Sequence, residues 1–538
     1  MLRAMAAPRC EKTERSAPST RRMRLLRAGW LLLTALAVLL PAVDAFARAG
    51  GGEHYRAPSP APHSSGGYSS GSGYHGSGGG GGIAFTELLF WIFRITFQYP
   101  LVMIPLWLFI AWMIYRSVKA QARQNGGGGG DDFPMSGGGG VIDPGPMAPR
   151  QNVHAELDQL KSRDPEFDPD SFFERTRKVF LDIQQAWSDR ALDKARQYMS
   201  DGLFRRFTTL QAIMEEEGRR NVLADASVHA VRVVEVAHTE AFDCLSLRVE
   251  ASMRDIDVPA KMPDELANKK AQSARMGSFA EVWTFVRRRD AKTRTGYDLG
   301  QGQCPNCGAP FTGGAANKCE YCGAIVNSGN YDWVLAEITQ PVEYAPHRGQ
   351  APGLRQLLAA DPNAATEVLR DRGLLVFWKW LECWVFSDPK RLQKLATPAQ
   401  SEAIFNEIQA MISRGGKMIV RVPAVGGSDV IAVETNIGGM DRVHVDIRWS
   451  GVLASTPAEA RAEPTPYRSV VTLVRQHGAQ SDRGTGLSNE RCGNCGAPLT
   501  NSDSTSCEYC NHDFTRASKE WQLESLVPYD EWQRPRGE

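Results

Sequence analysis

Eight of the eleven cysteines in this chain form two quartets with the same internal spacing. In each quartet, eleven residues separate two Cys-x-x-Cys pairs, and each pair can present two sulfurs to one ion. The quartets are Cys304, Cys307, Cys319 and Cys322, and Cys492, Cys495, Cys507 and Cys510. This spacing predicts two Zn²⁺-binding ribbons, at residues 302–326 and 490–514. Paired disulfides or redox-active Cys-x-x-Cys motifs are the alternative.

The predicted zinc ions would be structural. Four thiolates complete a tetrahedral shell and leave no position open for a reactive water. A small hairpin tip has little core of its own, so metal binding would supply its folding energy. Two further thiols, Cys244 at the start of a predicted strand and Cys383 in a tryptophan-rich segment, are expected to be buried and unreactive.

The segments that flank the two ribbons are also repeated. A constant offset of 188 residues separates Thr284 from Thr472, Cys304 from Cys492 and Trp333 from Trp521. An offset that holds over some fifty residues indicates a tandem duplication. Each ribbon is therefore predicted to be the extended tip of a hairpin, between two strands of its own module.

The upstream part of each module predicts helices followed by antiparallel strands. Apolar residues from Phe172 to Trp187 recur at helical spacing, and Ser171 with Glu174 resembles a capping box. A second helix is expected around Leu203–Met214, with its counterpart at Ala403–Ile412. Residues 245–253 and 442–449 alternate between apolar and polar side chains, which is typical of strands with one wet face. The predicted fold class is α+β, with helices on one face of each sheet.

The N-terminal region has the composition of a membrane anchor. Basic residues precede an apolar stretch at Leu31–Val43 and the small residues around Ala47, so 1–47 is interpreted as a signal peptide starting at Met1 or Met23, with an uncleaved anchor as the alternative. Residues 48–82 form a Gly/Ser-rich segment. Residues 83–119 are predicted to be a membrane segment, with a span at about 95–115, and a buried soluble helix is the alternative. A Gly-rich tether follows at 120–152.

Charge predicts the orientation of this span. The whole chain is balanced, with 62 basic and 61 acidic residues, but Arg116, Lys119 and Arg123 follow the span directly. The positive-inside rule then places the C-terminal modules in the cytoplasm. Reduced thiols for zinc binding are expected in the same compartment.

This layout resembles the bacterial Tim44-like proteins. The resemblance lies in the signal ending at Asp44–Gly52, the single span, the glycine tether, the helix from Phe172 to Asp189, and the strands at 281–287 and 333–338. It implies two such domains, at 153–345 and 363–538, joined by a linker at 346–362. It also implies a nuclear-transport-factor-two-like α+β fold with a pocket between sheet and helices, and a location at the bacterial inner membrane. The partners that it implies are inner-membrane or translocon proteins, preproteins and anionic lipid.

We weighed three functions from the sequence. A non-enzymatic membrane scaffold for protein translocation or membrane-protein assembly agrees best with the resemblance. Nucleic-acid or ribosome binding through the ribbons is the second, but acidic residues accompany their few lysines and arginines. The third is a pocket enzyme, for which the candidate acid–base groups are His229, His238, His444, Asp243 and Asp446. Phe204–Phe207, with two central arginines, could contact lipid or lie as an ordinary helix on the core. Ligand and oligomeric state stay open.

Overall fold

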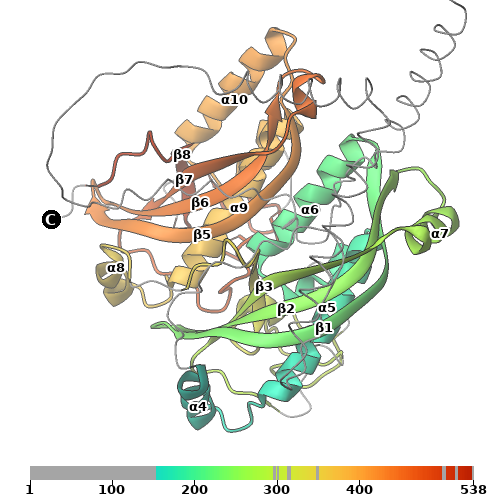
Figure 1. Cartoon of the computed structure of the whole chain (residues 1–538). Coiled ribbons are helices and arrows are strands. Elements are labelled where there is room, and N and C mark those ends of the chain that lie inside the picture. The colour runs from blue at the N-terminus through green and yellow to red at the C-terminus, as the bar shows by residue number, and fades with distance from the viewer. Residues whose placement is uncertain are drawn as a thin grey trace, which may run out of the picture. The chain divides into compact units, whose positions relative to one another are not determined.

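Two four-stranded antiparallel sheets with the same strand order organise the described part of the chain (Figure 1). The computed structural model describes residues 153–535, except 295–298, 300–301, 312–316, 347–349, 493, 500–503 and 515–518. The strands follow sequence order in both sheets, β1-β2-β3-β4 and β5-β6-β7-β8, so the predicted combination of helices with antiparallel sheets is confirmed. The predicted signal peptide, Gly/Ser-rich segment, membrane segment and tether lie outside the described residues.

Each sheet is accompanied by helices that precede it in the chain, and together they form one module. Module 1 contains α4 (Val153–Arg163), α5 (Pro169–Ser188), α6 (Asp201–Glu216), β1 (Arg219–His238), β2 (Phe242–Pro259), α7 (Asp264–Ser273), β3 (Met276–Arg288) and β4 (Val334–Thr339). Module 2 contains α8 (Leu354–Ala360), α9 (Thr366–Val385), α10 (Pro398–Ser413), β5 (Ile419–Ile437), β6 (Met440–Ala454), β7 (Thr465–Gln476) and β8 (Gln522–Pro528). The short 3-10 helices are η2 (Leu192–Lys194), η3 (Arg196–Tyr198), η5 (Val326–Ser328), η6 (Pro389–Arg391) and η7 (Glu459–Arg461).

The two modules match element by element. Phe285 pairs with Leu335 across β3 and β4, and Leu473 pairs with Leu523 across β7 and β8, which keeps the offset of 188. The helices are offset by 197 instead, since α5 begins at Pro169 and α9 at Thr366. Most of the difference arises between the second and third strands, where module 1 carries the ten-residue helix α7 and module 2 only η7. Each ribbon lies between the last two strands of its module, as the sequence predicts.

The first long helix of module 1 begins earlier than its sequence suggests. Its apolar stripe is buried, including Phe180 and Ile183, which have no exposed surface. The N-cap, however, is Asp168, whose carboxylate accepts a hydrogen bond from the Ser171 backbone N–H at 2.8 Å. The interpretation of Ser171 as the cap is therefore wrong. Pro169 explains the earlier start, because its fixed φ suits the first helical position.

The polar face of the first sheet is less wet than predicted. Leu245, Leu247 and Val249 on β2 are buried, as expected for the core face. Ser246, on the opposite face, is also buried, with 1% exposure. The start of α9 covers this end of the sheet, since Ala365 and Val368 pack in one cluster with Cys244. Module 2 therefore supplies the cover that a single module would lack.

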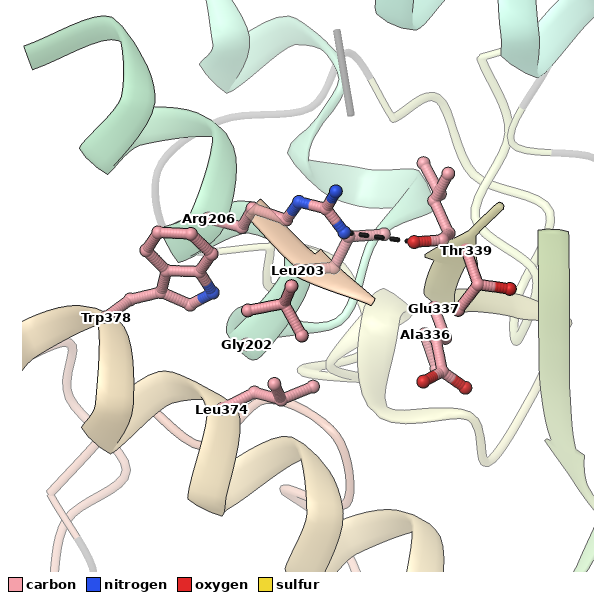
Figure 2. A pocket seen from close by; sticks show the side chains of 10 residues that line it. Gly202, Leu203, Arg206, Ala336, Glu337, Thr339, Leu374 and Trp378 are labelled. Atoms are coloured by element: carbon pink, nitrogen blue, oxygen red, sulfur yellow. Dashed lines mark hydrogen bonds between the residues drawn. The ribbon is translucent and has the colours of Figure 1, made fainter. Parts of the chain in front are cut away.

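Helices α6 and α9 meet at the junction of the modules. Gly202 on α6 lies against Asp371 on α9, where a Cβ at position 202 would come within 2.5 Å of the Asp371 Oδ1 atom. Beside this contact is a cavity of about 10 Å³, lined by Leu203 and Arg206 from α6 and Trp378 from α9 (Figure 2). Such a space holds about one water molecule. The apolar core is continuous across this junction.

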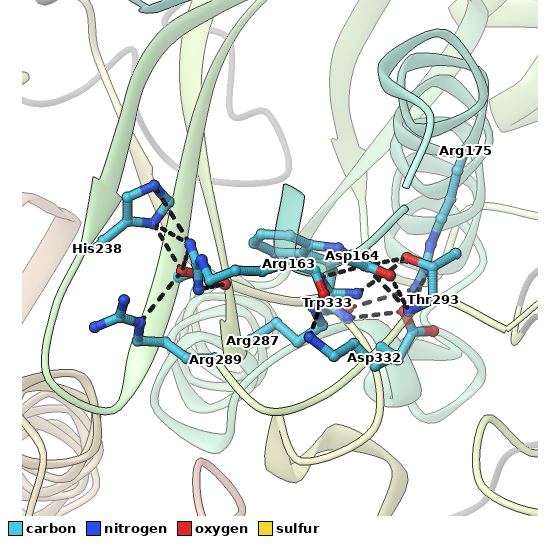
Figure 3. Close-up of polar contacts among 11 residues, drawn as sticks. Arg163, Asp164, Arg175, His238, Arg287, Arg289, Thr293, Asp332 and Trp333 are labelled. Carbon is cyan, nitrogen blue, oxygen red and sulfur yellow. Dashed lines mark hydrogen bonds and ion pairs between the residues drawn. The ribbon is translucent and has the colours of Figure 1, made fainter. Parts of the chain in front are cut away.

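A buried ion pair closes each module. The Arg287 guanidinium lies 2.7 Å from the Asp164 carboxylate and 4.5 Å from the centre of the Trp333 ring (Figure 3). The Asp164 carboxylate also accepts from the backbone N–H and the hydroxyl of Thr293. The pair thus connects the segment before α5, the end of β3 and the entry to β4. Module 2 repeats it with Arg475 and Asp361 at 2.7 Å, stacking on Trp521 and donation by Ser481.

We expect Arg475→Met to lower the free energy of unfolding by about 3–5 kcal/mol, because it leaves the Asp361 carboxylate buried without a counter-charge. Chemical denaturation of the full chain, followed by circular dichroism, measures the change. The double variant Arg475→Met/Asp361→Asn should lose less than the single one. As the matched control, Arg177→Met removes the partly exposed pair with Glu174 and should cost about 0.5 kcal/mol or less. Equal losses in Arg475→Met and Arg177→Met would contradict the structural role of the buried pair.

Candidate metal centres and the module junction

The structure brings each predicted cysteine quartet together. In each quartet, the four Sγ atoms lie within 4.8 Å of one another. The Sγ–Sγ distances are 3.8 Å for Cys304–Cys322 and Cys307–Cys319, 3.8 Å for Cys492–Cys510 and 3.7 Å for Cys495–Cys507. A tetrahedron with metal–sulfur bonds of about 2.3 Å has edges of about 3.8 Å. Each cluster therefore fits a metal ion with four thiolate ligands, such as Zn²⁺.

The same distances disfavour the disulfide alternative. A disulfide requires sulfur atoms about 2.05 Å apart. All ten cysteines in the described part of the chain are free thiols. Cys244 and Cys383 are buried, and burial raises the pKa of the Cys383 thiol to about 12. Both are therefore unreactive as thiolates, as the sequence predicts.

Tight turns present the sulfurs of each pair. The N–H of Gly308 donates to the carbonyl of Cys304 at 2.8 Å, and Gly496 does the same to Cys492 at 2.7 Å. Both glycines have a positive φ, which a residue with a Cβ rarely adopts. Asn511 supplies the left-handed residue in the second pair of the second ribbon, with φ of 56°. These turns explain why a glycine or asparagine follows each Cys-x-x-Cys pair.

An asparagine of the first pair contacts the last cysteine of the second pair in both ribbons. The Asn306 amide lies 3.4 Å from the Cys322 sulfur, and the Asn494 amide lies 3.4 Å from the Cys510 sulfur. The Asn494 hydrogen bond is the main reason that the pKa of Cys510 falls to about 6. Burial opposes the corresponding shift at Cys322, but the Ala324 backbone N–H and Asn306 lower its pKa to about 7. These donors favour the thiolate form that binds metal.

Cys507→Ser should reduce the metal content of the purified chain from two ions to about one, because a tetrahedral thiolate site with one hydroxyl loses most of its affinity. Elemental analysis measures this directly. Cys304→Ser should do the same for the first ribbon. The helices should survive in both variants, so the helical circular dichroism signal should change little. Full loss of the cooperative unfolding of a whole module would contradict the view that the ribbon is a separately stabilised tip.

A network of buried charges lies beside the second ribbon, at the module junction. The Arg205 guanidinium lies 2.6 Å from the Glu490 Oε2 atom, and the Lys379 ammonium lies 3.2 Å from its Oε1 atom. Although burial opposes the shift, Arg205 and then Lys379 lower the pKa of Glu490 to about 2. The network joins α6 of module 1, α9 of module 2 and the segment that leads into the ribbon.

Two buried carboxylates complete the network at the start of α6. Asp201 accepts hydrogen bonds from the Glu490 backbone N–H at 2.8 Å and from the Ser488 hydroxyl at 3.3 Å. Asp371 accepts from the Gly202 backbone N–H at 3.0 Å and from the Asn489 side chain at 2.8 Å. Burial raises the pKa of Asp371 to about 7, and Asp201 adds to the rise. Asp371 therefore stays protonated well above its ordinary range.

The aromatic and basic segment Phe204–Phe207 belongs to this junction. Phe204, Arg206 and Phe207 are buried, with 4%, 4% and 0% exposure. The Arg206 guanidinium donates to the carbonyl of Ile338 at 3.0 Å and faces the small cavity of Figure 2. Burial lowers the pKa of Arg206 to about 10. The core interpretation of this segment is therefore correct, because module 2 covers the face that could have met a lipid surface.

The histidines proposed as acid–base groups lie in separate places. His229 contacts Ser252, and His444 contacts Glu434 and Thr472 rather than Asp446. His238 (Figure 3) lies 2.7 Å from Asp243. It also lines a cavity of about 440 Å³.

Asp243 is also engaged by a cation. Arg163 contacts both of its carboxylate oxygens, at 2.9 and 3.2 Å, and the adjacent hydrogen bonds hold the pKa of Asp243 low even though burial opposes the shift. The carboxylate is therefore paired with an arginine as well as with the histidine. The geometry accounts for this cluster as an ion-pair network between α4 and the first hairpin.

Sequence reasoning missed the junction residues. Asp201, Asp371 and Glu490 carry no motif, and their roles depend on contacts between segments more than a hundred residues apart. One signal was available. Glu490 aligns at the offset of 188 with Gly302, so the two ribbons differ at the position two residues before their first cysteine.

Comparisons with known proteins identify the first module. The family model described as "Tim44-like domain" matches residues 153–301, which run from α4 through β3. This part of module 1 is therefore similar to a Tim44-like domain. No curated protein matches the chain. A solved structure described as "Ntf2 like protein involved in plasmid conjugation" aligns with 62% of this chain and 92% of its own at 8% identity, but its TM-score of 0.11 is too low to bear on the fold.

The search for membrane spans applies only to the described residues. No helix in that part of the chain has both the length and the apolar character needed to cross a bilayer. The predicted span at about 95–115 lies outside it.

Stability should depend on pH through Asp371. Its carboxyl has a pKa of about 7 in the folded chain and an ordinary value of 3.8. The unfolded chain therefore releases this proton at a lower pH, so the contribution of Asp371 to the free energy of unfolding falls as pH rises from about 4 to about 7. Asp371→Asn should remove this pH dependence, which amounts to about 2–4 kcal/mol of the free energy of unfolding between about pH 4 and pH 7.

Urea unfolding of the full chain at several pH values between 4 and 8 measures the effect. Asp193→Asn, at an exposed position, serves as the control and should keep the pH dependence of the original chain. A slope that persists unchanged in Asp371→Asn would show that other groups control it.

Proposed function

We propose that this protein is a membrane-anchored, non-enzymatic scaffold that presents two Tim44-like modules for protein translocation or inner-membrane protein assembly. The match of residues 153–301 to the Tim44-like family model carries this proposal. In it, residues 83–119 anchor the chain in the bacterial inner membrane with a single pass, and the modules face the cytoplasm. Anchoring would raise the local concentration of the modules near membrane partners.

The second module extends the proposal because it repeats the sheet, helices and ribbon of the first. The buried network between α6 and α9 joins the modules, so a partner would meet both modules and both ribbons together. In this proposal each ribbon binds one structural Zn²⁺ ion through its four cysteines. Among the described residues, three exposed aromatic side chains are available as contacts: Tyr321 and Tyr509 in the ribbons and Phe405 on α10, with 71%, 66% and 49% exposure. Tyrosine and phenylalanine are among the residues that anchor protein interfaces.

The same proposal treats the cavities as parts of the fold. The small cavities at the junction, of about 10–30 Å³, have room for about one water molecule each and not for a substrate. At the larger cavity near His238, the histidine and the neighbouring Asp243 are both bound to Arg163. Binding of a protein partner or of anionic lipid, without catalysis, is therefore the function that we propose.

Site-specific photo-crosslinking in cells would test this function. A photoreactive phenylalanine analogue replaces Tyr321, Tyr509 or Phe405 in the full chain, and Lys269 on α7 provides an exposed control position. We expect one or a few inner-membrane or translocon proteins to be captured from at least one aromatic position and not from Lys269. Adducts with lipid alone would indicate that these positions contact a bilayer surface and not a protein partner.

The anchor needs its own experiment. Deletion of residues 83–119 should move the chain from the membrane fraction to the soluble fraction, because the modules would lose their only proposed span. Carbonate extraction followed by immunoblotting measures the distribution. Retention of the deleted chain in the extracted membranes would contradict anchoring by this segment.

A further inference from the structure

The segment that leads into the second ribbon also forms part of the module junction. Residues 487–491 directly precede Cys492. The Glu490 side chain contacts Arg205 of module 1 and Lys379 of module 2, and its backbone N–H donates to Asp201 of module 1. Asn489 accepts from Arg372 at 2.6 Å through its carbonyl and donates to Asp371 through its side chain. Five residues therefore bridge α6 and α9.

The same segment is part of the ribbon itself. The carbonyl of Glu490 accepts from the Leu499 N–H at 3.1 Å, and the carbonyl of Gly496 accepts from the Arg491 guanidinium at 3.1 Å. Both bonds close the turn that holds Cys492 and Cys495. Glu490 thus has its backbone in the ribbon hairpin and its side chain in the junction, so the position of one depends on the other.

The first ribbon lacks this connection. Its hairpin has the equivalent backbone bond, from the Phe311 N–H to the Gly302 carbonyl at 2.7 Å. Gly302 occupies the place of Glu490 and has no side chain to reach α9. The base of the first ribbon instead makes uncharged contacts with both modules. The Asn327 amide donates to the Met199 carbonyl of module 1 at 3.0 Å, and the Ser328 carbonyl accepts from the Leu487 N–H of module 2 at 3.2 Å. The two ribbons are therefore equivalent as metal sites, but only the second has a charged side chain at its base that contacts the module junction.

We propose that metal loading of the second ribbon locks the two modules together through Glu490, whereas loading of the first ribbon acts mainly on module 1. The eight cysteines fit their ions equally well in both ribbons, so the difference comes from the segments before them. Without its ion, the second ribbon has little core to keep residues 487–491 in place. Release of these residues would remove the Glu490 carboxylate, and the two buried cations would then share Glu382, which contacts Arg205 at 3.4 Å and Lys379 at 3.8 Å. Two cations beside one carboxylate favour separation of α6 from α9.

An exposed ion pair across the junction reports on this state. Lys417, just before β5, lies 2.6 Å from Glu216 at the end of α6, and both side chains are about half exposed. A carbodiimide should join them by a zero-length amide crosslink when the modules are locked. Mass spectrometry of the full chain quantifies the crosslinked peptide. Hydrogen exchange of the α9 peptide gives a second readout of opening at the junction.

Cys510→Ser and Cys322→Ser are the matched pair of variants, since each removes the last cysteine of one ribbon. We expect Cys510→Ser to lower the crosslink yield and to increase the exchange of α9 on the order of tenfold. Cys322→Ser should leave both readouts within about twofold of the original chain. Equal effects of the two variants, or no effect of either, would overturn the proposal.

Glu490→Gly distinguishes the role of the Glu490 bridge from the role of metal binding. It places in the second ribbon the glycine that the first ribbon has at the equivalent position, and it keeps all eight cysteines. This variant should retain two ions per chain and still lose the crosslink. It also decides the outcome if Cys510→Ser unfolds module 2, which circular dichroism would reveal. A Glu490→Gly chain that keeps both its ions and its full crosslink would show that the ribbon does not control the junction. These readouts do not depend on the scaffold function, which the photo-crosslinking tests separately.

Discussion

The close contact between α6 and α9 is the constraint on which the arrangement of the two modules depends. Gly202 allows the helices to approach until the Asp371 carboxyl meets the backbone N–H of Gly202. No larger residue fits, because a Cβ would overlap the carboxyl oxygen. This approach buries Arg205, Arg206 and the facing acids, and buried charges require partners with good geometry. The ionic network, the small cavity and the continuous apolar core all follow from it.

The chain contains two copies of a module, and sequence differences between the copies allow them to pack against each other. Both copies keep the buried arginine–aspartate pair that closes the module, with Arg287 and Asp164 in one and Arg475 and Asp361 in the other. They differ where they meet. The polar face of the first sheet is covered by α9. The base of the second ribbon carries Glu490 where the first has glycine. Divergence of the contact surfaces in this way favours one pairing of the two copies, because the charged side chains at the junction lie opposite partners in the other module.

The two cysteine clusters show how the same chemistry serves different surroundings. Their sulfur geometry and the asparagine donors match in both ribbons, as expected for sites that bind the same type of ion. A metal ion stabilises a hairpin that has few apolar residues, and any segment rooted in that hairpin shares the stabilisation. The functional consequence of each ion is thus set by the residues just outside the cysteine pairs.

Local patterns in the sequence were sufficient for the cysteine clusters, the duplication, the α+β class, the helices α5, α6 and α10, and the strands β2 and β6. Cysteine spacing defines a coordination shell within some twenty residues, and apolar periodicity defines which side of a helix or strand is buried. The start of α5 was misplaced because Asp168 and Pro169 form a better cap than Ser171. The burial of Ser246, the pairing of Asp371 with Gly202 and the bridge made by Glu490 could be decided only by the tertiary structure. These contacts join residues that lie far apart in the chain, and their energies depend on desolvation that no local pattern encodes.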